Sequence, residues 1–323
     1  MDSIQARLTR RGFALGAAAI GLIPLGARGE QAKPGKVFLD YTQKELDDAY
    51  DQSVWAKNAG EVIKRYGVAS AAIRAKYKFE TKAYGVGEDE KLDIFAPVKA
   101  PPAAGAPIHM FIHGGAWRGG RKEMYSFPAP TFVENGAIYI AIGFSSIPKV
   151  RLPDMAHQIR SAIAWAHKNA KSFGGDPARL YISGHSSGGH LCGVALVTDW
   201  SRYGAPADTV KAGLSVSGMY ELDPVMLSAR SSYVKISSEE KAALSSLRQL
   251  DRIACPVALA YGEGESPEFK RQSRAMAAAL KAKGKASELI EVKGVNHFEI
   301  IETLGKPDGA LGKAALKQMG RTA

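Results

Sequence analysis

Cysteine is scarce in this chain of 323 residues, which contains only Cys192 and Cys255. Two cysteines are too few for a disulfide scaffold, and their spacing matches no CxxC or zinc-binding pattern. We expect two buried free thiols, with a single disulfide as the alternative in an oxidising compartment. The sequence also lacks a cluster of metal-ligating residues and a nucleotide-binding glycine loop after a strand. It therefore predicts no cofactor and no metal.

Runs of positive charge are also missing. The 43 Lys and Arg residues exceed the 32 Asp and Glu residues, which gives a formal net charge of +11. These cations are scattered along the chain, and charge alone describes solubility and steering rather than a binding site. Nucleic acid is therefore not an expected partner. The hydrophobic fraction of 46% and the charged fraction of 23% are ordinary for a globular protein, and they exclude a disordered chain or a polytopic membrane protein.

The apolar stretch near the N-terminus is too short to cross a membrane. It spans residues 13–25, which is 13 residues against the roughly 20 that a helix needs. It follows Arg10 and Arg11 and precedes several small residues, a pattern that resembles a twin-arginine export signal. Residues 1–29 are therefore predicted to be a removable signal peptide. The expected partner is the twin-arginine export machinery, and the expected location is periplasmic or secreted.

The remaining residues, 30–323, alternate between apolar runs and amphipathic segments and are expected to form one domain. The predicted strands are residues 77–84, 92–98, 108–112, 137–144, 180–183, 212–216, 257–261 and 289–292. The predicted helices are residues 47–66, 154–173, 187–197 and 267–283. This alternation indicates an α/β fold, with a mostly parallel sheet, helices on both faces and an antiparallel first pair of strands. The polar, serine-rich segment 221–250 is predicted to be a small helical insertion that forms a cap.

A GxSxG motif occupies residues 184–188, between a predicted strand and a predicted helix. In that context the motif forms a tight turn that exposes its serine hydroxyl above the sheet. Ser186 is therefore the expected nucleophile. A second motif, His-Gly-Gly-Ala-Trp, follows a predicted strand at residues 113–117. We expect the backbone N–H groups of Gly114, Gly115 and Ser187 to form an oxyanion hole.

A serine nucleophile needs a base, and the chain contains seven histidines. His297 follows the last predicted strand, where a strand-to-helix loop would deliver a general base. The acid that orients this base should lie between Ser186 and His297 in the chain, in a loop after a strand. The loop at residues 261–267 contains both Glu263 and Glu265, and spacing alone does not choose between them.

Four segments together resemble a known family: HGGAW, GHSSGGH, GEGESPEFKRQS and GVNHFEI. They are similar to the kynurenine formamidase-like and carboxylesterase group of α/β-hydrolases, and the resemblance extends from about Tyr41 to about Leu304. It implies the α/β-hydrolase fold and acyl transfer through an acyl-enzyme on Ser186. In that family the acid is usually Asp within a GExDSPEF-like segment. Aligned residue by residue, Glu265 takes that place and Glu263 does not, which implies a Ser-His-Glu triad.

The expected substrate is a small carboxylic ester with a short acyl chain and an aryl leaving group. Trp117, Phe144 and Tyr220 fall at predicted carboxyl ends of strands, where pockets form in open α/β sheets, and they are the expected pocket residues. An aryl formamide of the N-formylkynurenine type is the alternative substrate. Two further alternatives are a peptidase and a non-catalytic binding protein on the same fold. The sequence predicts no particular oligomeric state.

Overall fold

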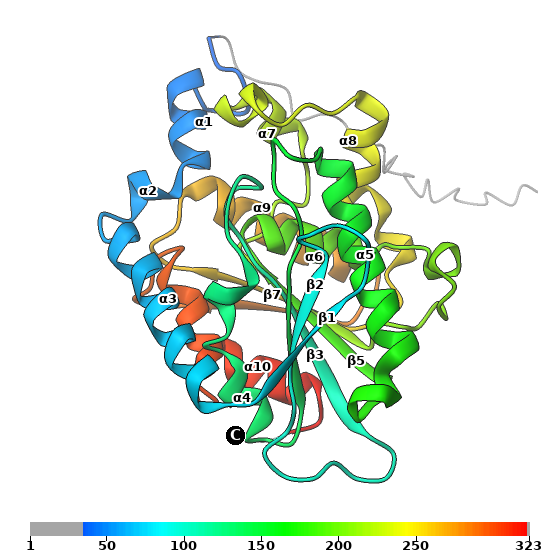
Figure 1. Ribbon diagram of the computed structural model, residues 1–323. Helices are drawn as coiled ribbons and strands as arrows, with labels where there is room; N and C mark the ends of the chain where they lie inside the picture. Colours follow the sequence, from blue (N-terminus) through cyan, green and yellow to red (C-terminus); the bar gives the residue numbers. More distant parts are fainter. Residues whose placement is uncertain (1–34, 322–323) are drawn as a thin grey trace, which may run out of the picture.

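An eight-stranded, mostly parallel sheet forms the centre of the computed structural model, which describes residues 35–321 (Figure 1). The strands are β1 Phe79–Ala83, β2 Lys91–Phe95, β3 Ala106–Ile112, β4 Ile138–Ile142, β5 Gly175–His185, β6 Ala212–Val216, β7 Val257–Gly262 and β8 Ser287–Val292. Their order across the sheet is β1-β2-β4-β3-β5-β6-β7-β8. Strand β2 is antiparallel to both of its neighbours, and the other neighbouring strands are parallel. The predicted signal peptide, residues 1–29, lies outside the described residues.

Both faces of the sheet are apolar, and helices cover both. In β3, Ile108, Met110 and Ile112 pack into the core on one face, whereas Phe111 packs into the core on the other. The helices of the first face are α1 Gln43–Tyr50, α5 Leu152–Asn169, α6 Ser187–Leu196 and α9 Pro267–Ala282. Those of the second face are α3 Ala59–Lys76, α4 Ala129–Val133 and α10 Ala310–Gln318. Four short 3-10 helices complete the connections: η1 Lys122–Tyr125, η2 Ala170–Phe173, η3 Trp200–Tyr203 and η6 Glu299–Gly305.

This architecture is the α/β-hydrolase fold that the sequence predicts. The eight predicted strands are all present, and the antiparallel first pair is confirmed. Strands β3, β4, β6 and β7 are buried on both faces, which explains why their sequences read as continuous apolar runs rather than as alternating ones. No helix in the described part of the chain is long and apolar enough to cross a membrane.

The single helix predicted over residues 47–66 is wrong. Three helices occupy this region, α1, α2 (Gln52–Trp55) and α3, because the backbone becomes extended at Asp51 and again at Ala56. The side chain of Asp51 accepts a hydrogen bond from the backbone N–H of Ser53 and thereby caps α2. A capping aspartate competes with helix continuation, and this signal marks the first break. The bend turns the end of α1 toward the carboxyl ends of the parallel strands.

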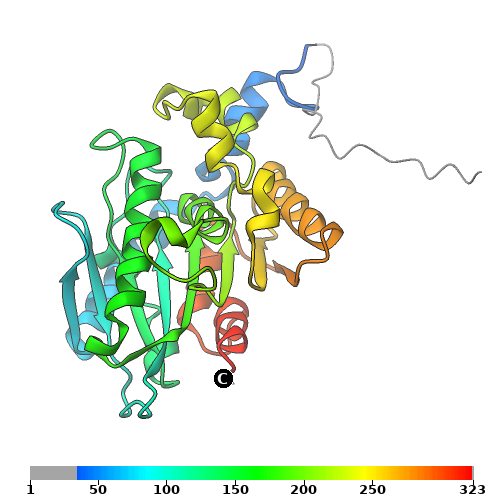
Figure 2. The ribbon, with the colours of Figure 1, turned by 90° about the vertical axis from the view of Figure 1, so that its right-hand side faces the viewer.

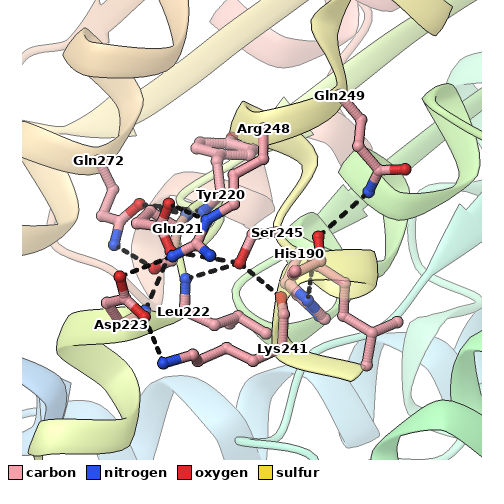
Figure 3. A network of polar contacts seen from close by, with 12 residues as sticks. His190, Tyr220, Glu221, Leu222, Asp223, Lys241, Ser245, Arg248, Gln249 and Gln272 are labelled. Atoms are coloured by element: carbon pink, nitrogen blue, oxygen red, sulfur yellow. Dashed lines mark hydrogen bonds and ion pairs between the residues drawn. The ribbon is translucent and has the colours of Figure 1, made fainter. Parts of the chain in front are cut away.

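Short helices occupy the serine-rich segment 221–250 and its end: α7 Asp223–Leu227, η4 Ala229–Ser232, α8 Ser238–Leu244 and η5 Ser246–Arg252. Helices α1, α7 and α8 lie together at one end of the sheet in both ribbon views (Figures 1 and 2). A polar network fastens this segment to the rest of the molecule (Figure 3). Within it, the Arg248 guanidinium donates to the carboxylates of Glu221 and Asp223, and the Gln272 side chain accepts the backbone N–H groups of Tyr220 and Glu221.

Candidate active site

Ser186 occupies the turn between β5 and α6 in a strained backbone conformation. Its φ of 59° and ψ of −122° lie in a region that non-glycine residues rarely adopt. The backbone of this turn packs tightly against the end of β3, since a Cβ added at Gly188 would lie 2.1 Å from the carbonyl oxygen of Ile112. Only glycine fits there. The local geometry therefore presents the Ser186 hydroxyl at the N-terminus of α6, directly beyond the carboxyl end of β5.

Two other strand ends bring a histidine and a carboxylate to this serine. The Oγ of Ser186 lies 2.9 Å from Nε2 of His297, which follows β8. The Nδ1 of His297 lies 3.3 Å from Oε2 of Glu265, which follows β7. An ionised carboxylate only accepts hydrogen bonds, so Nδ1 is the donor in this contact and Nε2 is left to accept the serine proton. The structure thus brings together the three residues that the sequence singles out, in the order serine, imidazole, carboxylate.

Glu265 and Glu263 have opposite environments, although they are two residues apart. Glu265 is 1% exposed, and its Oε1 accepts hydrogen bonds from Oγ of Ser217 at 2.5 Å and from the backbone N–H of Gly262 at 2.8 Å. Glu263 is exposed and pairs with Lys293 at 3.1 Å. Of the two glutamates, only Glu265 contacts the imidazole of His297.

The His-Gly-Gly loop after β3 lies against the serine. A Cβ added at Gly114 would lie 3.0 Å from Cβ of Ser186, and one added at Gly115, whose φ is +124°, would lie 2.2 Å from the carbonyl oxygen of Gly119. Among the described residues, the backbone N–H groups of Gly114, Gly115 and Ser187 donate to no protein acceptor. Unpaired N–H groups beside a nucleophile are the donors from which an oxyanion hole is built.

Three other histidines near the serine are buried, uncharged and structural. The Nε2 of His185 lies 2.8 Å from the carbonyl oxygen of His297, and burial lowers the pKa of His185 well below its ordinary value. Burial also lowers the pKa of His113 and of His190 to about 4. The His113 ring stacks on Phe144 with centroids 4.2 Å apart, beside the glycines that it precedes. These three imidazoles are therefore uncharged near neutral pH.

A pocket of about 490 Å³ opens above Ser186 and His297. Its walls come from the end of α1 and from α2, from α3, from the loop after β3, from η4 in the 221–250 segment and from the loop that carries His297. The lining side chains include five aromatic rings, two arginines and two aspartates: Tyr50, Tyr66, Tyr125, Tyr233, Phe298, Arg118, Arg230, Asp47 and Asp51.

The three predicted pocket residues do not line this pocket, and that prediction is wrong. Trp117 is 1% exposed, and its indole Nε1 donates to Nδ1 of His190. Tyr220 is fully buried in the network of Figure 3, and its hydroxyl donates to Oγ of Ser215. Phe144 lines a separate polar cavity of about 710 Å³. Each residue does follow a strand, but the side chains of Trp117 and Tyr220 lie in the core, and that of Phe144 packs on His113 beside the second cavity.

The sequence pattern does not predict the residues that do line the pocket, because they come from segments far apart in the chain. Tyr50 lies at the end of α1, Arg118 in the loop after β3, and Arg230 in η4. One signal was available, because a capping aspartate at residue 51 predicts the helix break that exposes this end of α1. Among the described residues, no group of three or more His, Cys, Asp or Glu side chains could hold a metal ion.

Comparison with known proteins places the chain among hydrolases. The BD-FAE family model matches residues 92–213, and the prolyl oligopeptidase family model matches residues 155–310. A kynurenine formamidase of Salmo salar is 32% identical over 297 residues, covering 88% of this chain and 98% of that protein. Esterase LipQ of Mycobacterium tuberculosis is 31% identical over 242 residues, covering 68% of this chain and 57% of that protein. The solved structure of a Pyrobaculum calidifontis esterase matches with a TM-score of 0.64 and 16% identity, covering 83% of this chain and 97% of that one, which shows the shared fold.

Proposed function

We propose that this chain, which belongs to the α/β-hydrolase family of the kynurenine formamidase that it matches, hydrolyses small carboxylic esters through an acyl-enzyme on Ser186. The observation that carries this proposal is the continuous contact from Ser186 through His297 to Glu265, below an open pocket. The proposed substrates have a short acyl group and an aryl leaving group, which the aromatic lining of the pocket would contact by stacking.

The proposed reaction begins with attack of the Ser186 oxygen on the substrate carbonyl carbon, while His297 takes the serine proton at Nε2. The carbonyl oxygen becomes an oxyanion that accepts hydrogen bonds from the free N–H groups of Gly114, Gly115 and Ser187. The imidazolium then returns its proton to the leaving group as the bond to that group breaks. Water, deprotonated by His297, hydrolyses the acyl-serine and regenerates the hydroxyl.

Glu265 has two roles in this scheme. It accepts a hydrogen bond from Nδ1–H of His297, which fixes the tautomer with a free Nε2, and its negative charge stabilises the imidazolium that forms during each proton transfer. The two hydrogen bonds to its other oxygen, from Ser217 and Gly262, hold the carboxylate in place. His185 contacts the carbonyl oxygen of His297 and thereby helps to position the base.

Hydrolysis of an aryl formamide is the second candidate function. It is favoured by the match to a kynurenine formamidase over 98% of that protein. Both candidates transfer a small acyl group to Ser186 and release an aromatic group, so they use the same machinery. They differ in the leaving atom, because an amine must be protonated by His297 as it departs, whereas an aryl oxide is already a good leaving group.

A substrate panel tests both candidates. The panel compares kcat/KM for p-nitrophenyl acetate, butyrate and decanoate with kcat/KM for N-formylkynurenine. We expect the acetate or the butyrate to be the best ester. Preference for decanoate would contradict the short acyl chain, and a formamide value about 100-fold above the best ester would make the formamide the substrate class. Ser186→Ala should lower every one of these rates by at least about 1,000-fold and abolish labelling by a fluorophosphonate.

A further inference from the structure

Arg230 is a buried cation in the wall of the pocket. Its side chain is 8% exposed, and its guanidinium Nε and Nη2 donate to the carbonyl oxygen of Tyr50 at 3.2 and 2.6 Å. The remaining nitrogen, Nη1, has only the thioether sulfur of Met219 at 3.7 Å, which is a weak acceptor. None of the ion pairs among the described residues includes Arg230. The guanidinium thus lies in the pocket without a carboxylate partner.

Such a charge is expensive to bury unless an anion compensates for it. The rings of Tyr50, Trp117 and Phe269 lie 5.4 to 5.9 Å from the guanidinium carbon and offset part of this cost. Burial lowers the pKa of Arg230 from its ordinary value, and the nearby Tyr233, Tyr50 and Asp51 oppose this shift. Arginine nevertheless stays protonated in proteins, so the pocket keeps a fixed positive charge.

A second arginine lies in the same wall. Arg118 stacks over the ring of Tyr233 at 4.7 Å and makes no ion pair among the described residues. The two aspartates of the pocket are occupied elsewhere. The carboxylate of Asp47 accepts the backbone N–H of Ala229, and the carboxylate of Asp51 accepts the N–H and hydroxyl of Ser53. Both carboxylates hold local turns through Oδ1, and neither forms an ion pair with Arg230 or Arg118 among the described residues, although Asp51 favours the charged form of Arg230.

We propose that Arg230, assisted by Arg118, binds a carboxylate that the substrate carries at a position away from the bond that breaks. The substrate class is then a small ester or amide with an anionic substituent, and the guanidinium of Arg230 supplies a charge-assisted hydrogen bond through Nη1. This inference rests on the proposed function, because it assigns a role in the pocket that opens onto Ser186. It specifies the substituent and leaves the choice between ester and formamide to the panel above.

The competing explanation is structural. Arg230 fastens η4 to the end of α1 through the carbonyl oxygen of Tyr50, so its loss would loosen the pocket. Loosening affects charged and neutral substrates alike, whereas loss of an anion subsite affects only the charged ones. A ratio of rates for a carboxylate substrate and its neutral isostere therefore separates the two explanations.

The experiment uses matched pairs of aryl and acyl substrates. The first pair is 3-carboxyphenyl acetate and 3-carbamoylphenyl acetate. The second pair is 4-carboxyphenyl acetate and 4-carbamoylphenyl acetate. The third pair is monophenyl succinate and phenyl succinamate. In the wild-type protein we expect kcat/KM to favour the carboxylate by about 10-fold or more in at least one pair. Arg230→Gln should reduce this ratio to about 1, and Arg118→Gln should lower it less. Arg252→Gln, which removes an exposed arginine at the end of η5, should leave it unchanged.

A ratio near 1 for every pair in the wild-type protein would overturn the proposal, and so would a preference that survives Arg230→Gln. If Arg230→Gln does not fold, Arg230→Lys supplies the comparison, because it keeps the charge and loses the fork of donors. Calorimetric titration with benzoate and with benzamide gives a readout that does not need turnover. Benzoate should bind Ser186→Ala at least about 10-fold more tightly than benzamide. If the protein hydrolyses none of the substrates but still binds benzoate more tightly than benzamide, the proposed function alone is refuted. If benzoate and benzamide bind equally well, the anion subsite alone is refuted.

Discussion

At the scale of single residues, the candidate site depends on individual side-chain contacts, and two neighbouring glutamates make different ones. Glu265 contacts the base while Glu263 pairs with a surface lysine, although both lie in the same four-residue loop between β7 and α9. The backbone turn between them directs one side chain inward and the other outward. Chemically identical residues therefore acquire different environments, and mutagenesis can compare them directly.

Glu265→Gln should lower kcat far more than Glu263→Gln. The amide keeps the size of the glutamate but can donate to Nδ1 of His297, which favours the wrong tautomer. The corresponding change in serine proteases costs about 10,000-fold, and we expect a loss that approaches this value. Steady-state kinetics of the two variants with p-nitrophenyl acetate would measure it. The reverse ranking would transfer the role of the acid to Glu263.

Ser217→Ala should also reduce kcat, by about 10-fold, because it removes one of the two donors that fix Oε1 of Glu265. Ser217 has a φ of 52°, which alanine tolerates no worse than serine, so the backbone should not be perturbed further. The matched control is Ser215→Ala, because that buried serine donates to the carbonyl oxygen of Gly189 and does not touch the carboxylate. Equal kcat values for the two variants would show that Ser217 does not position the acid.

At the scale of elements, the pocket is assembled where loops meet over one edge of the sheet. Strands β3, β5, β7 and β8 each end in a loop that supplies part of the site, because parallel strands place their carboxyl ends on the same edge. The break between α1 and α2 and the short helix η4 then enclose the space above it. The loop after β3 is the most restricted of these segments, since positive φ values occur at Gly115, Ala116 and Trp117.

Gly115→Ala should therefore abolish most of the activity while leaving the sheet folded. The new Cβ would overlap the carbonyl oxygen of Gly119, so the loop must move and carry its N–H groups away from the serine. Loss of one oxyanion donor costs about 100- to 1,000-fold in rate, and we expect kcat to fall by that amount. Gly67→Ala is the control, because no atom lies within 4 Å of its new Cβ and the position lies inside α3. That variant should keep full activity and gain about 0.5–1 kcal/mol in stability.

At the scale of the whole molecule, the core contains imidazoles that are neutral in the folded state. The ring of His109 stacks on Phe132, which also contacts Tyr139, and burial lowers the pKa of His109 to about 3. In the unfolded chain this pKa returns to about 6.5, so below that pH the unfolded state binds a proton that the folded state does not. His113 and His190 behave in the same way, with folded values of about 4. The free energy of unfolding should consequently decrease as pH falls from about 6.5 toward 4.

His109→Phe tests this linkage by removing one of these protons. The slope of unfolding free energy against pH, from urea titrations between pH 6 and 4, should become shallower by about 1.4 kcal/mol per pH unit. The position stacked on Phe132 suits phenylalanine, although the hydrogen bond to Ser183 is lost. An unchanged slope would mean that His109 does not control the acid sensitivity. The absolute stability at pH 7 is not the test, because His109 is mostly neutral in both the folded and the unfolded state at that pH.

We also propose that the protein is exported in its folded form through the twin-arginine route, a prediction that rests on Arg10 and Arg11 ahead of the weakly apolar residues 13–25. Changing both arginines to lysine keeps the charge and removes the motif. Cell fractionation should then find the hydrolase activity in the cytoplasm instead of the periplasm or the medium. Unchanged export of the double variant would refute this route.

The sequence by itself determined the fold class and two residues of the candidate triad, Ser186 and His297. Apolar runs that alternate with helical segments form a local sequence pattern that predicts a parallel sheet. The GxSxG turn requires small residues at fixed spacing, so it too is recognisable without knowledge of distant contacts. The choice of Glu265 was implied by family resemblance, and the structure places that residue beside His297.

Only the tertiary structure decided which side chains surround the serine. Trp117, Phe144 and Tyr220 follow strands as predicted, but whether a side chain enters the pocket or the core depends on the turn after each strand and on what packs above it. Tyr50 and Arg230 are 180 residues apart in the sequence and meet because a helix break and an insertion converge over the same strand ends. Contacts of this kind depend on how segments pack, and no local pattern of apolar and polar residues encodes them.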